Sequence, residues 1–103
     1  YSCVSRLGAA QTALAGAQAD LDRIEREIAA NEAAIVSPAT PHPARIDHLS
    51  ALKHLHEERG RVRAALPDLV HDVEAAEDDL NAYQRALAAL DRNGAVTPLS
   101  ASY

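Results

Sequence analysis

An apolar residue recurs every seven positions along most of the chain, and this repeat limits the possible folds more than any other feature. In the first half, one column is Leu7, Leu14, Leu21, Ile28 and Ile35, and a second column, three residues later, is Cys3, Ala10, Ala17, Ile24 and Asn31. Columns spaced in this way are the a and d positions of a coiled coil. They predict a helix over about residues 2–35, with Ser2 or Ser5 as its N-cap.

A second repeat follows a proline-rich segment. Prolines at 38, 41 and 43 each disfavour helix in the preceding residue, so we expect a loop over residues 36–42. The next a column is Leu52, Arg59, Leu66, Val73, Leu80 and Leu87, and the next d column is Leu55, Val62, Leu69, Ala76, Tyr83 and Leu90. The phase never slips, which predicts a second helix over about residues 43–92.

Gly60 and Pro67 lie inside the second repeat. A proline in a helix interior costs about 3 kcal/mol and usually kinks the helix. A complete break would instead give a three-helix bundle. Because no turn dipeptide is present and the repeat continues in phase, we expect one helix with a kink near residues 60–67, ended by Asn93-Gly94 and followed by a tail at 95–103.

These elements predict an all-α fold, an antiparallel two-helix coiled-coil hairpin over residues 1–94, completed by oligomerisation or by a partner. The expected register sets Ile28 against Leu55 and Cys3 against Leu80. Nothing in the first helix would then cover the residues that continue the seam. We call these residues the C-terminal stripe and predict that they contact protein: Tyr83, Leu87 and Leu90.

Residues 7–19 contain no charged side chain, and small residues lie outside the seam. We call Gly8, Ala9, Ala13 and Gly16 the small-residue band, and we predict it as a second protein contact because small side chains let helices approach closely. A simpler interpretation is an exposed helix rich in Ala, the best helix former.

Three polar residues occupy seam positions: Asn31, His48 and Arg59. In the expected register Asn31 and His48 lie close together, where they would fix the alignment of the helices or respond to pH. The alternative is that His48 reaches solvent beside the loop. Arg59 would lie near Asp20, and an ion pair between them would also fix the alignment.

Charge and motifs argue against several function classes. The chain has 15 acidic and 10 basic residues, and its basic cluster at 53–63 is interrupted by Glu57 and Glu58 without a nearby aromatic residue, so we expect no nucleic-acid partner. No apolar stretch is long enough for a membrane span. His42, His48, His54 and His56 lack metal-ligand spacing, and Asp68, His71 and Glu74 would face solvent. We therefore predict no catalytic residue, metal or cofactor.

The single cysteine and the start of the chain bear on the cellular context of the protein. Cys3 cannot form an intrachain disulfide. We expect it to be buried among apolar residues, with an intermolecular bridge as the alternative, and a reducing intracellular compartment is slightly favoured. Gln11, Thr12 and Gln18 interrupt the apolar segment near the start, so we expect no cleaved signal peptide there. The chain begins at Tyr1 rather than Met, and we expect residues before it.

The function predicted from these features is that of a non-enzymatic structural or assembly subunit, which associates with itself or enters a larger complex. An adaptor, chaperone or regulator that binds a different protein is the alternative. A small metal-dependent enzyme is a more distant one. Self-association of the isolated chain distinguishes the first two.

Overall fold

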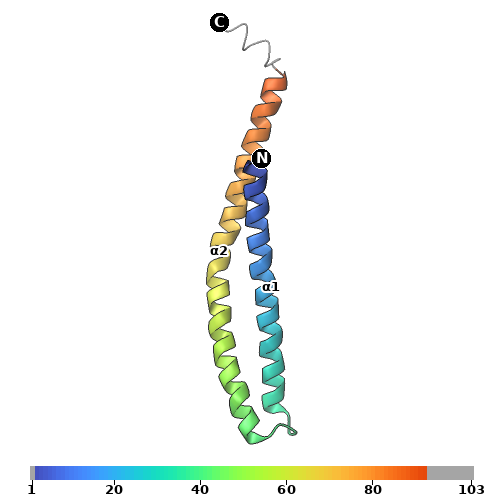
Figure 1. Cartoon of the computed structure of the whole chain (residues 1–103), viewed down its shortest axis with the longest axis vertical. Helices are drawn as coiled ribbons and strands as arrows, with labels where there is room; N and C mark the ends of the chain where they lie inside the picture. The colour runs from blue at the N-terminus through green and yellow to red at the C-terminus, as the bar shows by residue number, and fades with distance from the viewer. Residues whose placement is uncertain (1, 93–103) are drawn as a thin grey trace.

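The computed structural model describes residues 2–92 as two long helices, α1 (Ser2–Val36) and α2 (His42–Arg92). They lie side by side and antiparallel, and the described chain contains no strand (Figure 1). The predicted all-α helical hairpin is confirmed. The expected stop at Asn93-Gly94 and the expected tail at 95–103 lie outside the described residues.

The loop between the helices is held mainly by Ser37. The Ser37 carbonyl oxygen accepts a hydrogen bond from the Thr40 amide at 3.2 Å and another from Nη2 of Arg45 at 2.9 Å. The Ser37 hydroxyl accepts one from the Ala39 amide at 3.3 Å. The prolines end α1, as expected. Arg45, near the start of α2, links this helix to the loop through its hydrogen bond to Ser37.

The seam follows the heptad columns closely. From Ser2 to Asn31, every residue of the two predicted columns is buried or half-buried, and every other residue is exposed. The central cluster contains Ile24, Ile28 and Leu55, with Leu52 and Val62 packed against it. Only four residues of the described chain are buried, the fourth being Ala76. The hairpin therefore has a thin core, since each helix shields the other on one side only.

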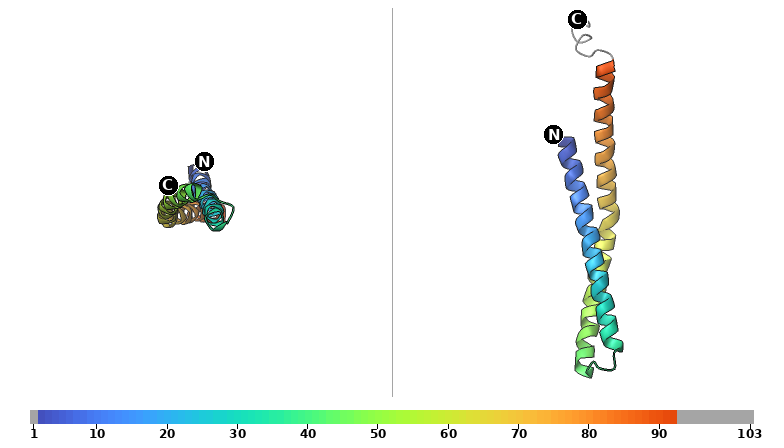
Figure 2. Two further views of the ribbon diagram at one scale, coloured as in Figure 1. Left: turned by 90° about the horizontal axis from the view of Figure 1, so that it is seen from below. Right: turned by 90° about the vertical axis from the view of Figure 1, so that its right-hand side faces the viewer.

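The helix α2 runs unbroken through Pro67, so the three-helix arrangement does not form. Its ribbon is bowed, with the convex side away from α1 (Figure 1), and the two helices cross when seen from the side (Figure 2). Pro67 is exposed. A proline on the solvent side removes a backbone hydrogen bond there, which favours curvature toward the packed partner.

Candidate interaction surfaces

The C-terminal stripe lies on the part of α2 that extends past the start of α1 (Figure 1). Tyr83, Leu87 and Leu90 are 37%, 43% and 48% exposed, whereas Leu80, one step earlier in the seam, is half-buried. The seam between the helices thus ends at Leu80. Beyond Leu80, α2 continues the a and d columns, but α1 (Ser2–Val36) does not extend beside them.

Two residues of the small-residue band line a groove between the helices, and the other two do not. Ala9 and Ala13 line a shallow open groove between the helices, together with Ala10 and with residues of α2 that include Asp72 and Ala75. Gly8 and Gly16 do not line this groove. A Cβ atom added to either glycine would meet nothing within 4 Å, so packing within the hairpin does not require them to be glycine.

Asn31 and His48 are brought together across the two helices. The Asn31 side-chain amide donates from Nδ2 to the carbonyl oxygen of Glu27 at 2.7 Å, which leaves Oδ1 as an acceptor. His48 donates to that oxygen from Nδ1 at 2.8 Å. The contact joins α1 and α2 at one level and so can fix their alignment.

We expect Asn31 and His48 to be energetically coupled. Asn31→Ala and His48→Ala should each lower the free energy of unfolding, and the double variant should lose less than the two losses added together. The difference should be about 0.5–1.5 kcal/mol, the net worth of one hydrogen bond. Urea unfolding of the four proteins, followed by circular dichroism, measures it. Additive losses would show that the bond does not align the helices.

Arg59 does not take the role expected for it. It is half-buried, and Nη2 donates to Nδ1 of His56 at 2.8 Å, one turn earlier on the same helix. The expected ion pair with Asp20 does not form, and Asp20 has no ion pair with any described residue. The bond to His56 is local, so the guanidinium satisfies it without reaching across to α1.

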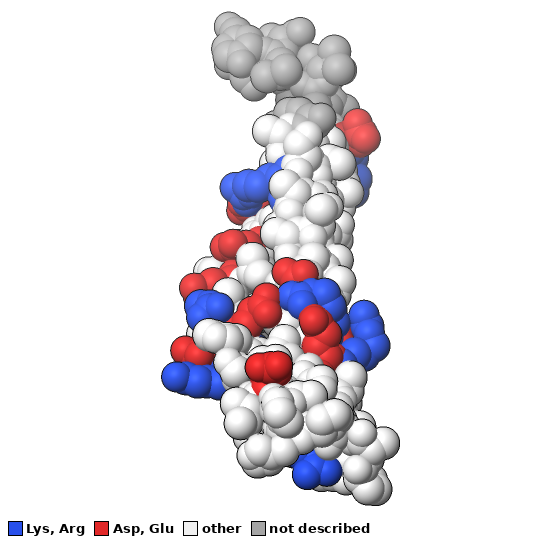
Figure 3. Space-filling model, turned by 60° about the horizontal axis from the view of Figure 1, so that its bottom comes forward, with Lys and Arg blue, Asp and Glu red and all other residues white. Residues whose placement is uncertain are grey.

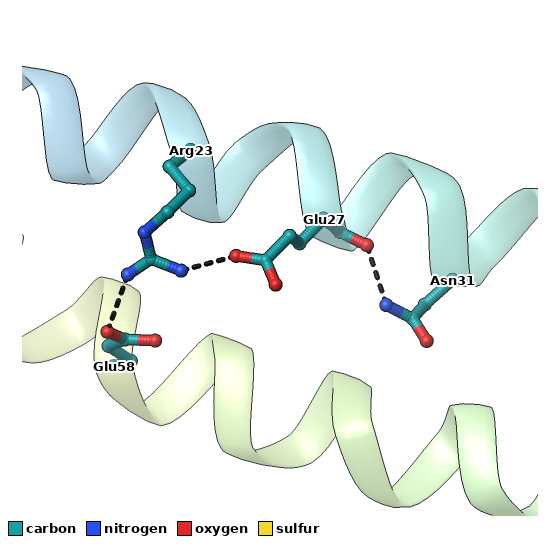
Figure 4. A network of polar contacts seen from close by, with 4 residues as sticks. All are labelled: Arg23, Glu27, Asn31 and Glu58. Carbon is teal, nitrogen blue, oxygen red and sulfur yellow. Dashed lines mark hydrogen bonds and ion pairs between the residues drawn. The ribbon is translucent and has the colours of Figure 1, made fainter.

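Other charged residues, which the heptad columns did not predict, join the helices instead. Arg23 pairs with Glu58 at 2.8 Å and also with Glu27 of its own helix (Figure 4). Arg63 pairs with Glu25 at 3.3 Å. The hydrogen bonds that Arg23 donates to Glu58 and, to a smaller extent, to Glu27 raise the pKa of its guanidinium. Glu25, Glu58 and Arg63 lie at the e and g positions that flank the seam, where opposite charges are the sequence signal for such pairs. Arg23 lies at a c position, so this signal does not apply to it.

The loop end of the hairpin carries an apolar surface that was also not predicted. Val36 is 80% exposed, and Ile46 and Leu49 are each 55% exposed. Charged residues are sparse over this end of the molecule (Figure 3). The signal for it was available, because all three residues are large and apolar yet lie outside the a and d columns.

The chain matches no family model, no curated protein and no solved structure. Among residues 2–92, no three His, Cys, Asp or Glu side chains gather where they could hold a metal ion. Neither α1 nor α2 contains an apolar stretch that would cross a membrane.

Proposed function

We propose that this hairpin is a non-enzymatic structural subunit that assembles by self-association. The observation that carries the proposal is the C-terminal stripe, which continues the seam on α2 for roughly 18 Å past the start of α1. Its three large side chains keep the spacing of packed seam residues but remain about two-fifths exposed. Contiguous apolar surface of this kind marks a protein contact.

The thin core supports the same proposal. Leu7, Leu14, Leu66 and Leu69 occupy seam positions but are only half-buried, because the other helix of the hairpin covers each of them from one side. Full burial of a leucine side chain is worth about 1.5–3 kcal/mol. Association of two hairpins would recover the part of this energy that one hairpin leaves unused.

The first test is the mass of residues 1–103 by light scattering after gel filtration, over a tenfold range of concentration. We expect a dimer or a larger species. Leu87→Asp should weaken association at least tenfold, because it places a charge in the C-terminal stripe. Ala88→Asp is the matched control, since it adds the same charge at the adjacent exposed residue outside the stripe.

Two outcomes would contradict the proposal. A monomer at every concentration would favour the adaptor alternative, in which these surfaces bind a different protein. Equal behaviour of Leu87→Asp and Ala88→Asp would show that the stripe is not the contact. Circular dichroism of both variants checks that the helices are retained.

A further inference from the structure

The charges of α2 change sign at its middle. Pro67 is the central residue of this 51-residue helix. Before it, residues 53–63 hold four cations and two carboxylates; after it, residues 68–79 hold six carboxylates and no Lys or Arg: Asp68, Asp72, Glu74, Glu77, Asp78 and Asp79. Two such helices attract each other when they lie antiparallel, because each basic half then faces an acidic half.

The hairpin leaves most of these charges without partners of its own. The α1 segment at 7–19 is uncharged, and Arg6 reaches only Asp79. Within the described chain, Asp68 and Asp72 form no ion pair, and neither does Arg61. Opposite charges that could neutralise one another are therefore held apart on a single helix.

These charges share one side of α2 with the groove. Residues 61, 65, 68, 72 and 75 follow spacings of four and three, so they form one row along the helix. Asp72 and Ala75 of this row line the groove together with Ala9 and Ala13 of α1. Small side chains on both helices allow a further helix to approach at the short end of the usual 8–10 Å axial distance.

From this juxtaposition we infer that the row is covered by a second copy of the chain, with its α2 antiparallel to this α2 about a two-fold axis near residue 65. The inference rests on the self-association proposed above and adds its register. Arg61 of each copy then lies between Asp68 and Asp72 of the other, which are one turn apart. The two-fold axis forms this contact twice.

Helix length supports the same register. Because the charges change sign at the middle of α2, the alignment that pairs them also overlaps the two α2 helices over nearly their whole length. It brings the C-terminal stripe to the level of residues 40–47 of the second copy, at the start of that copy's α2. Parallel α2 helices in register would instead set acid against acid.

Charge reversal tests the register. Arg61→Glu and Asp72→Arg should each raise the dissociation constant of the dimer at least tenfold in low salt, and the double variant should recover most of the loss. Arg26→Glu is the control, because Arg26 is exposed, has no ion pair in the described chain and changes charge equally. Sedimentation equilibrium gives the constants. If the dissociation constant of the double variant is no lower than those of the single variants, the proposed pairing of Arg61 with Asp72 of the second copy is wrong.

Cysteine cross-linking tests the orientation, with Cys3→Ala as the background. Ala65→Cys should form a disulfide-linked dimer on oxidation, because an antiparallel two-fold sets residue 65 beside its own copy. Ala82→Cys should not, whereas a parallel dimer would link both. If wild type associates and Leu87→Asp disrupts it, but Ala65→Cys does not cross-link, this arrangement is wrong while self-association stands. A wild-type protein that is monomeric at every concentration would contradict both this arrangement and the proposed self-association.

Discussion

Replacing Ile24 with alanine should lower the free energy of unfolding by about 2–5 kcal/mol, the range for truncating a fully buried isoleucine. Ile24 is 0% exposed and lies at the centre of the only cluster of buried residues in the described chain. Small domains have unfolding free energies of only about 5–15 kcal/mol, and a thin core favours the low end. Thermal unfolding followed by circular dichroism should show a large fall in melting temperature.

Ile46→Ala is the matched control for this change. Ile46 is 55% exposed, so the same three side-chain carbons are removed from a largely solvated site. Its substitution should change the free energy of unfolding by less than about 0.5–1 kcal/mol. Both variants should be measured at one low concentration, because self-association adds to apparent stability. Similar losses at the two sites would place the core elsewhere than at Ile24.

The heptad columns predicted the fold because each column depends only on spacing along the chain. Helix lengths and the antiparallel register then placed the C-terminal stripe beyond α1 without any knowledge of side-chain packing. The depth of burial was not predictable in this way. Ile35 belongs to the same column as Ile28 but is only half-buried, because burial depends on where two curved helices approach most closely.

Polar contacts were predicted less well, and the reason is side-chain reach. The columns identified Asn31 and His48 as neighbours, since both lie in the seam and their short side chains have few directions available. Arg59 has a long side chain that bonds His56 instead of crossing to Asp20. The apolar loop end was missed for a different reason: Val36 and Ile46 lie outside the a and d columns, and the prediction followed only those columns.

Pro67→Ala should raise the free energy of unfolding by about 1–3 kcal/mol. Alanine restores the backbone hydrogen bond to the carbonyl oxygen of Arg63 and removes the clash of the proline ring, which together cost about 3 kcal/mol in a helix interior. The site is exposed, so no packed side chain is lost. Chemical denaturation at fixed protein concentration measures the change.

Gly60→Ala separates the proline's own effect from simple helix propensity. Gly60 lies in the same helix, and a Cβ atom there would meet nothing within 4 Å, so this variant should gain only about 1 kcal/mol. A gain at Pro67 smaller than that at Gly60 would mean that straightening α2 pulls Leu66 and Leu69 away from α1. The curvature of α2 would then be needed for its seam residues to pack against α1. Pro67 would stabilise the hairpin by curving α2, even though it weakens the helix itself.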